Sequence, residues 1–258
     1  MSVTGSAIAV TRADGVLTLT FDRPDKANSL LPDDLARARG VLADLDGVRA
    51  VVFRGAGSRG FSAGMNVGAF ASFTPESGEV FIRTGRDLLA AVRTAPVVTA
   101  AVVDGYCLGI AFELALACDL RIATPRSTFG LPEIKVGVPS VIDAALLHHH
   151  VGLAFAKEII LTGDAYPVAE FASSRLVNAV VDADEVDAEL DRWLERTSRH
   201  TRVVTATQKR LFETWLNTPL VEGIDESTVE FGRVFTDAAT AQALAAYRAG
   251  LGGGGARD

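Results

Sequence analysis

The amino-acid sequence predicts a layered α/β domain followed by a helical C-terminal region. In the first half of the chain, the order strand, glycine-containing turn and helix occurs three times. The strand candidates are short and apolar, which is typical of strands buried between layers. Strands that alternate with helices pack as a sheet covered by those helices. The chain has 258 residues, 48% of them hydrophobic, so it can bury a substantial core.

The first unit begins with a hairpin over residues 7–21, in which an Asp-Gly pair forms the turn. A helix is expected to open at Pro32, because proline suits the first turn and the two aspartates after it suit the positive end of the helix dipole. A second Asp-Gly pair ends this helix. A buried strand over residues 50–54 and a glycine-rich loop follow.

The second unit starts with residues 70–77, whose serine, threonine, proline and glycine predict a loop. Helical periodicity resumes from Val80 to Arg93, and Pro96 ends it. The apolar run Val97–Val103 then predicts another buried strand.

The third unit brings together the residues of greatest chemical interest. A helix is expected from about Gly109 to Cys118, and it carries Glu113. A short apolar run then leads to a second carboxylate, Glu133. A helix N-terminus and two carboxylates so close in sequence are what an enzyme uses to hold an anion beside an acid–base pair.

The rest of the chain is mainly helical. A helix is expected to start at Pro167, a short strand covers 176–181, and an acidic helix start follows at 182–189. From about residue 199 the pattern is wholly helical, with segments 200–217, 219–235 and 237–249. These helices cannot easily bury their apolar faces alone, so we expect them to pack on the core or on a partner subunit. The predicted units are a core over 1–198 and a helical region over 199–258 that ends in a flexible, glycine-rich tail.

Composition restricts the cellular setting. A net charge of −7 argues against nucleic-acid binding, which needs a basic face. The two cysteines, Cys107 and Cys118, are roughly 16 Å apart if the segment between them is helical, too far for a disulfide. Unpaired cysteines, the lack of a leader-like start and apolar runs interrupted by acids predict a cytoplasmic protein without a membrane span.

Five blocks of sequence add a second line of evidence. They are DRPDKANSL (22–30), GFSAGMNV (60–67), VDGYCLGIAFELALACDLRIA (103–123), FGLPEIKVGVP (129–139) and LTGDAYPVAEFASSRLVNAVV (161–181). In this order and spacing they resemble the enoyl-CoA hydratase/isomerase (crotonase) superfamily along nearly the whole chain. The resemblance implies a spiral of β-β-α units, C-terminal helices that form a trimer or a dimer of trimers, and an acyl-CoA thioester as substrate. It implies no metal and no organic cofactor, since coenzyme A is part of the substrate.

The resemblance also implies an oxyanion hole for the thioester oxygen. Its two donors are the backbone N–H groups of Met65 and Ile110, which follow Gly64 and Gly109. Such donors contribute about 3 to 4 kcal/mol each in a transition state. The residue types are consistent with this assignment, because the glycine before each donor allows a substrate to approach the backbone closely. The same resemblance places Ala63 and Asn66 with these residues in the substrate-binding loop. The glycines alone would indicate no more than turns.

Glu113 and Glu133 match the catalytic pair of family hydratases. Resemblance assigns Glu113 to the water and Glu133 to the Cα proton, although the two can share both tasks. Apolar neighbours predict that Glu113 is partly buried, which raises the pKa of its carboxyl group. Taken alone, Glu113 could be a solvated helix position, and Glu133 a loop carboxylate that caps a helix.

Four positions depart from the commonest family pattern. Ile110 and Ser140 stand where glycine is usual, and Asn66 stands where aspartate is usual. Ser140 keeps the N–H that helps to hold the hydratase water and adds a hydroxyl group. The side chain of Ile110 must point away from the substrate. Asp143 replaces part of a glycine-rich turn; we expect it to cap the helix that follows, or to act as a third acid if it faces the pocket.

Binding of coenzyme A requires cations. The resemblance places Arg23 and Lys26 beside its nucleotide end; the weaker candidates are Arg54, Arg59, Lys209 and Arg210. Four apolar side chains are candidates for the acyl pocket, although each could equally belong to the core: Phe70, Phe73, Phe81 and Val141. The three consecutive histidines 148–150 point about 100° apart on a helix and cannot converge on one metal ion.

The sequence therefore favours a hydratase-like lyase that adds water to the 2,3-double bond of an acyl-CoA. One alternative is a Δ3,Δ2-enoyl-CoA isomerase or another crotonase-type acyl-CoA enzyme. An alternative of another class is an acyl-CoA binder without catalytic activity.

Overall fold

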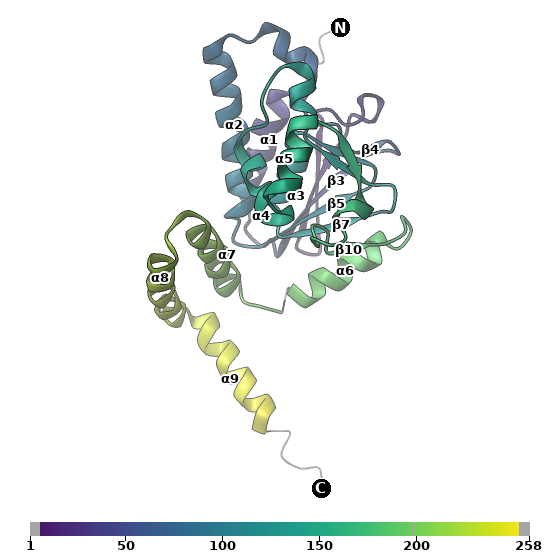
Figure 1. Cartoon of the computed structure of the whole chain (residues 1–258). Helices are drawn as coiled ribbons and strands as arrows, with labels where there is room; N and C mark the ends of the chain where they lie inside the picture. Colours follow the sequence, from purple (N-terminus) through teal and green to yellow (C-terminus); the bar gives the residue numbers. More distant parts are fainter. Residues whose placement is uncertain (1–5, 198, 253–258) are drawn as a thin grey trace.

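The structure is a computed structural model that describes residues 6–197 and 199–252. Two sheets form its centre, and helices cover both faces of the larger one (Figure 1). The larger sheet has the order β1-β2-β3-β5-β7-β10. Its strands are β1 (Ile8–Ala13), β2 (Val16–Phe21), β3 (Ala50–Gly55), β5 (Val98–Val103), β7 (Leu120–Ala123) and β10 (Ala179–Val180). The first pair is antiparallel and the others are parallel.

The smaller sheet has the order β4-β6-β8-β9. Its strands are β4 (Gly60–Ser62), β6 (Tyr106–Leu108), β8 (Thr128–Gly130) and β9 (Ala165–Pro167). Only the pair β8–β9 is antiparallel. Sequence periodicity missed all four strands, because three residues are too few to show alternation.

Alternation along β3 shows how the strands are buried on both faces. Val51 and Phe53 belong to the main core, whereas Ala50 and Val52 belong to a second, smaller core. Helix α6 (Val186–Thr197) closes the second core with Leu190 and other side chains. A strand apolar at every position suits this arrangement, because successive side chains point to opposite faces.

The remaining helices cover the main core or extend from it (Figure 1). They are α1 (Pro32–Leu42), α2 (Pro75–Arg93), α3 (Ile110–Ala117), α4 (Leu147–Val151), α5 (Leu153–Thr162), α7 (Arg202–Asn217), α8 (Leu220–Arg233) and α9 (Ala238–Gly252). Short 3₁₀ helices join several of these elements: η1 (Pro24–Lys26), η2 (Val67–Ser72), η3 (Pro132–Val136), η4 (Ile142–Leu146), η5 (Val168–Phe171) and η6 (Val234–Thr236).

The predicted hairpin is confirmed, with positive φ at Asp14 (49°) and Gly15 (74°), as its turn type requires. The predicted start of α2 is wrong by five residues. Thr74 caps this helix, and its hydroxyl accepts a hydrogen bond from the Ser77 N–H. Residues that favour loops by composition here form a reciprocal N-terminal cap. The helix predicted from Pro167 is only the short element η5.

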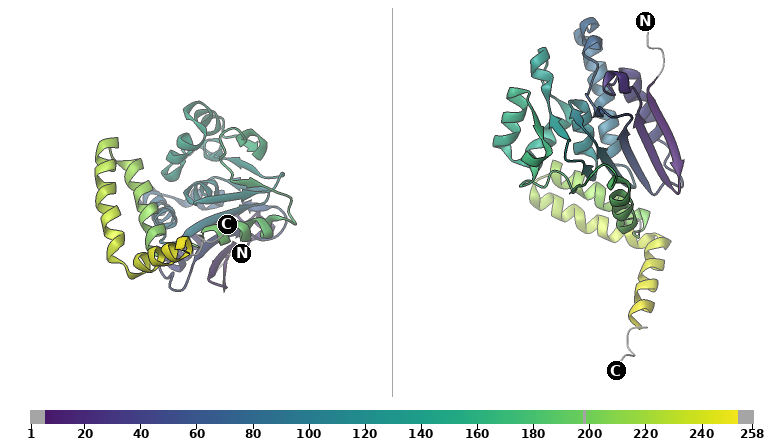
Figure 2. Two further views of the ribbon diagram at one scale, coloured as in Figure 1. Left: turned by 90° about the horizontal axis from the view of Figure 1, so that it is seen from below. Right: turned by 90° about the vertical axis from the view of Figure 1, so that its right-hand side faces the viewer.

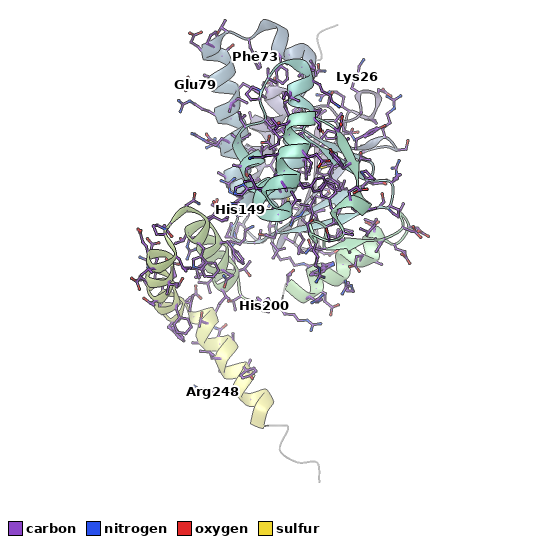
Figure 3. The ribbon with its side chains drawn as sticks, in the orientation of Figure 1. Lys26, Phe73, Glu79, His149, His200 and Arg248 are labelled. Atoms are coloured by element: carbon purple, nitrogen blue, oxygen red, sulfur yellow. The ribbon has the colours of Figure 1, made fainter. Side chains whose placement is uncertain are left out.

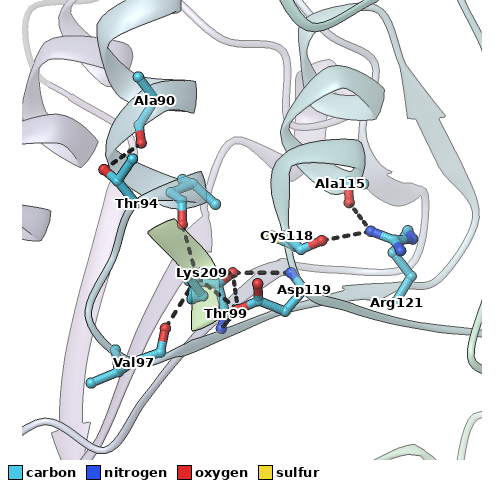
Figure 4. Close-up of polar contacts among 10 residues, drawn as sticks. Ala90, Thr94, Val97, Thr99, Ala115, Cys118, Asp119, Arg121 and Lys209 are labelled. Carbon is cyan, nitrogen blue, oxygen red and sulfur yellow. Dashed lines mark hydrogen bonds and ion pairs between the residues drawn. The ribbon is translucent and has the colours of Figure 1, made fainter. Parts of the chain in front are cut away.

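The C-terminal helices lie at one end of the core, and α9 points away from it (Figure 2). Helix α7 is attached to the core by Lys209, which is only 5% exposed. The Lys209 Nζ donates to the carbonyls of Val92 and Val97 at 3.2 Å and to Asp119 Oδ2 at 2.7 Å (Figure 4). The predicted flexible tail lies, from residue 253 onward, outside the described residues. None of the helices in the described part of the chain is long and apolar enough to cross a membrane.

Candidate active site

Two glycines allow the segments of the predicted oxyanion hole to meet. Gly64 has φ of 81°, and a Cβ there would lie 2.5 Å from the carbonyl oxygen of Leu108 and 3.4 Å from the Cα of Gly109. The two backbones are therefore in contact, which any side chain at Gly64 would prevent.

The backbone around Met65 directs its N–H group away from a neighbouring segment. The Leu30 N–H donates to the Gly64 carbonyl at 2.8 Å, and the Asn66 N–H donates to the Leu30 carbonyl at 2.9 Å. In such a parallel bridge the middle residue turns its own N–H to the other side. Met65 lines the apolar cavity described below. Its role as the first oxyanion donor stays a prediction.

Ile110 is the first residue of α3, where backbone N–H groups have no acceptor within the helix. Gly109 before it has φ of 57° and accepts from the Glu113 N–H at 3.0 Å. The positive end of the helix dipole adds to the donor capacity of this position.

The side chain of Ile110 packs towards α2. A Cβ at Gly85 would be 3.0 Å from Ile110 Cδ1 and 3.3 Å from Ile142 Cδ1. The absence of a side chain at Gly85 therefore makes room for the isoleucine that replaces the usual glycine. The isoleucine borders the cavity rather than filling the donor position.

Glu113 is the most strongly perturbed acid of the site. Its side chain is 3% exposed, and its Oε2 has no hydrogen-bond partner among the described residues. Burial raises the pKa of this carboxyl group well above its ordinary value, and the charges of Glu133 and Asp143 raise it further. Backbone N–H groups of Asp143 and Ala144 partly oppose the rise. The predicted burial and pKa direction are both confirmed.

Glu133 is the second residue of η3. Its Oε1 lies where a Cβ on Gly109 would be 2.5 Å away, so the carboxylate touches the start of α3. Its Oε2 accepts a hydrogen bond from the Ser140 hydroxyl at 2.7 Å. Burial raises the pKa of Glu133, and the Ser140 hydrogen bond limits the rise because it stabilises the ionised form. Glu133 does not cap a helix with its side chain.

The capping prediction for Asp143 is wrong. Asp143 lies inside η4, no side-chain cap exists there, and its carboxylate pairs with the Arg93 guanidinium. Its side chain does not line the cavity, so it is not a third acid at the substrate. A buried carboxylate needs a compensating partner, and the Arg93 guanidinium supplies it.

An apolar cavity of about 750 Å³ joins these groups. Glu113, Glu133, Ile110 and Gly109 all line it. The rest of the wall is largely apolar: Val67, Phe70, Phe73, Phe81, Ile82, Val136, Val138, Pro139, Val141 and Ile142. All four predicted acyl-pocket side chains are among these, and the rings of Phe70, Phe73 and Phe81 contact one another at centroid distances of 5.3 to 6.2 Å.

Comparison with known proteins identifies the family of the chain. The family model described as Enoyl-CoA hydratase/isomerase matches residues 11–249. The chain belongs to this family. A probable enoyl-CoA hydratase, echA8, of Mycobacterium tuberculosis is 31% identical over 252 residues, which are 95% of this chain and 96% of that protein. The Mycobacterium leprae counterpart is 33% identical over 236 residues, 89% of this chain and 90% of that protein.

Solved structures give the same answer for the fold. The putative enoyl-CoA hydratase of Streptomyces coelicolor has a TM-score of 0.87 and 29% identity, covering 96% of this chain and 93% of that one. Pseudomonas aeruginosa DspI has a TM-score of 0.87 and 26% identity, covering 95% and 96%. The predicted crotonase-like α/β fold is therefore confirmed.

In this member of the hydratase/isomerase family, the loop over residues 22–31 is held together by internal hydrogen bonds. Arg23 Nη1 donates to Asp34 Oδ2 at 2.9 Å, and Asp34 is fully buried. Burial alone would raise the pKa of Asp34, but hydrogen bonds from Arg23 and from two backbone N–H groups outweigh it and lower the pKa. The Arg23 guanidinium is thus engaged inside the fold. Lys26 is exposed (Figure 3). Coenzyme A binding by either residue stays a prediction.

Sequence reasoning missed the polar residues that support this loop. Asn28 Nδ2 donates to the carbonyls of Ala56 and Gly60, and the Ser62 hydroxyl accepts from the Gly64 N–H at 3.1 Å. Asn66 Oδ1 accepts from the Gly68 N–H at 3.0 Å and caps η2, while Ala63 borders the cavity. Position 28 has a positive φ of 53°, a region that asparagine tolerates better than most residues. The clue in the sequence is therefore the residue type at this position.

The weaker cation candidates have other partners. Arg54 pairs with Asp187, Arg210 pairs with Glu230, and Arg59 donates to a backbone carbonyl. The suggestion that Lys209 contacts coenzyme A is wrong, because Lys209 is buried against Asp119.

The consecutive histidines lie on α4 and give no metal site. His148 and His149 are exposed with ring centroids 3.9 Å apart, and burial lowers the pKa of His150 to about 4. Among the described residues, no group of three or more His, Cys, Asp or Glu side chains is arranged to hold a metal ion.

Proposed function

We propose that this protein is an enoyl-CoA hydratase that adds water across the 2,3-double bond of an acyl-CoA thioester. One observation carries the proposal: the buried carboxyl group of Glu113, the half-buried carboxyl group of Glu133 and the two backbone segments that begin at Gly64 and Gly109 lie at the same apolar cavity. An isomerase needs only one base, whereas hydration needs a base for the water and an acid for the carbon. The proposed reaction needs no bound cofactor.

The reaction follows from these positions. The N–H groups of Met65 and Ile110 donate to the thioester oxygen and draw electron density from the double bond. Glu113 takes a proton from water as the water oxygen bonds to Cβ, and Glu133 then protonates Cα. Elimination of water is the same path reversed, with the two carboxyl groups exchanging roles.

Catalysis requires that the pair hold one proton between them. Burial and the mutual repulsion of the two carboxylates favour this singly protonated state, because both pKa values are raised. Ser140 stabilises the charge on Glu133 through its hydroxyl group, and we propose that its N–H positions the water.

The test is hydration of crotonyl-CoA, followed by loss of the absorbance of the conjugated thioester. Wild-type protein should hydrate it, and Glu113→Gln and Glu133→Gln should each lose on the order of 10² to 10⁴ in kcat. Absence of hydration with acyl chains of several lengths, in a folded preparation that binds acyl-CoA, would sink the hydratase assignment. Retained isomerisation of a 3-enoyl-CoA by Glu113→Gln would support the isomerase instead.

We also propose that the chain assembles as a trimer or a dimer of trimers in the cytoplasm. The support is a set of large apolar side chains that are 44% to 79% exposed on α7, α8 and α9 and the segments joining them. They are Phe212, Trp215, Leu216, Leu220, Val221, Ile224, Val229, Phe231, Phe235, Leu244 and Tyr247. A contiguous apolar surface of this kind is typical of a subunit interface.

A further inference from the structure

A chain of charged side chains connects Glu113 to the C-terminal region. Arg93, at the end of α2, forms an ion pair with Asp143 in η4. The Arg93 Nε also donates to both carboxylate oxygens of Glu213, in α7, at 3.1 Å. Asp143 in turn lies close to Glu113, because η4 packs against α3; the backbone N–H and the charge of Asp143 both act on the Glu113 carboxyl group. Four elements far apart in sequence thus meet behind one catalytic acid.

The geometry around Asp143 is costly to build. Asp143 is 6% exposed, and the residue before it, Ile142, has φ of 45°. A β-branched residue in the left-handed region is a genuine outlier, and such strain persists only where the surrounding structure imposes it. The strained turn sets the Asp143 carboxylate against Arg93 and its backbone N–H against Glu113.

We propose that Asp143 is a positioning residue for Glu113, and that Arg93 and Glu213 hold it in place so that the C-terminal region takes part in building the catalytic centre. The inference rests on the proposed function, in which Glu113 handles water. Asp143 acts through Glu113, since it does not line the substrate cavity.

The electrostatic consequence has a definite sign. The charged groups that act on Glu113 are Glu133 across the cavity and Asp143 behind it; Arg93 and Glu213 stand behind Asp143. A negative charge on Asp143 opposes ionisation of Glu113, and the positive charge on Arg93 moderates that effect. Removing one partner or the other must therefore change the ionisation of Glu113 in opposite directions.

The experiment measures the pH profile of kcat/KM with crotonyl-CoA, which reports the free enzyme. Asp143→Asn should move both limbs of the profile to lower pH by about one unit. Arg93→Gln should move them to higher pH by a similar amount. The double variant should return towards the wild-type profile, because the pair is removed as a neutral unit.

Two further variants test the reach of the chain. Glu213→Gln should move the limbs in the same direction as Asp143→Asn but less, because its charge reaches Glu113 only past Arg93. Arg83→Gln removes an exposed ion pair of the same helix, with Glu79, and should move nothing. The proposal would be overturned if Asp143→Asn and Arg93→Gln lower activity at every pH without moving either limb, or if these two variants move the limbs in the same direction as each other.

Infrared difference spectroscopy separates this proposal from the hydratase assignment. The band to follow is the protonated carboxyl stretch that Glu113→Gln abolishes, titrated without substrate. If the band titrates in the opposite directions predicted for the two single variants while crotonyl-CoA is not hydrated, the positioning role holds and the assigned reaction fails. If crotonyl-CoA is hydrated while the pH at which the band titrates is the same in both single variants as in wild type, the assigned reaction holds and the positioning role of Asp143 fails.

Discussion

Helices α3 and α8 differ in how far their side chains are buried. All eight residues of α3 are buried, including the charged Glu113. In α8 only Gly223 is buried, whereas Leu220, Val221 and Phe231 are 67% to 79% exposed. Helix α3 buries an acidic side chain, and helix α8 exposes apolar ones. The burial of these particular side chains does not follow from residue type.

Each departure from ordinary burial has a cost and a use. Burying Glu113 disfavours its charged form, which raises its pKa and suits the acid–base role proposed for it. Leaving α8 apolar and exposed favours association with another surface. Helix α7 connects the two regions, because Lys209 and Glu213 both reach from it into the core. The four predictions below break or sharpen this comparison.

The largest effect is expected at the start of α3. Gly109→Ala places a methyl group 2.5 Å from Glu133 Oε1, on a residue with positive φ. It should lower kcat for crotonyl-CoA by about 10² to 10³, since it displaces an acid and an oxyanion donor together. The control is Gly40→Ala in α1, where a Cβ meets nothing within 4 Å. Full activity of Gly109→Ala would contradict the site geometry.

The attachment of α7 is the next strongest feature. Lys209→Met leaves Asp119 and two carbonyls without their buried cation, and should lower the free energy of unfolding by about 2 to 4 kcal/mol. Urea denaturation followed by circular dichroism measures it. The exposed Lys157→Met in α5 should change stability by no more than about 0.5 kcal/mol. An equal effect of both substitutions would mean that Lys209 does not anchor the helix.

The buried acid should reduce stability as pH rises. The folded protein raises the pKa of Glu113, so it holds a proton that the unfolded chain releases above about 4.5. Stability from this group is complete below that pH and is lost as pH rises towards the folded value. Glu113→Gln should therefore unfold at a higher temperature than wild type, with a gain that grows from pH 5 to pH 8. Exposed Glu222→Gln serves as the control, and a gain independent of pH would contradict the linkage.

The smallest effect on folding is expected on α8. Leu220→Glu combined with Phe231→Glu should change the unfolding free energy of a subunit by only about 0.5 kcal/mol, because both side chains are exposed. The same variant should sediment as a smaller species than wild type in analytical ultracentrifugation. Val180→Glu, at an exposed position of β10, should leave the sedimentation unchanged. An unchanged assembly in the α8 variant would mean that another surface joins the subunits.

The sequence by itself determined the local elements and the pieces of the site. Apolar runs predicted the strands of the larger sheet, the Asp-Gly pair predicted the first hairpin, and the neighbours of Glu113 predicted its burial. The resemblance to the family also pointed to Gly64 and Gly109, whose backbones contact each other in the fold. These features depend on a few adjacent residues, which is why they are readable along the chain.

Tertiary structure alone decided the partners of charged groups. Nothing in the sequence relates Arg93 to Asp143 or Glu213, which lie 50 and 120 positions away, or Lys209 to Asp119. An ion pair depends on distance in space and on loss of water, and a local pattern carries neither. Asp143 therefore read as a helix cap in the sequence and is a buried partner of Arg93 in the fold.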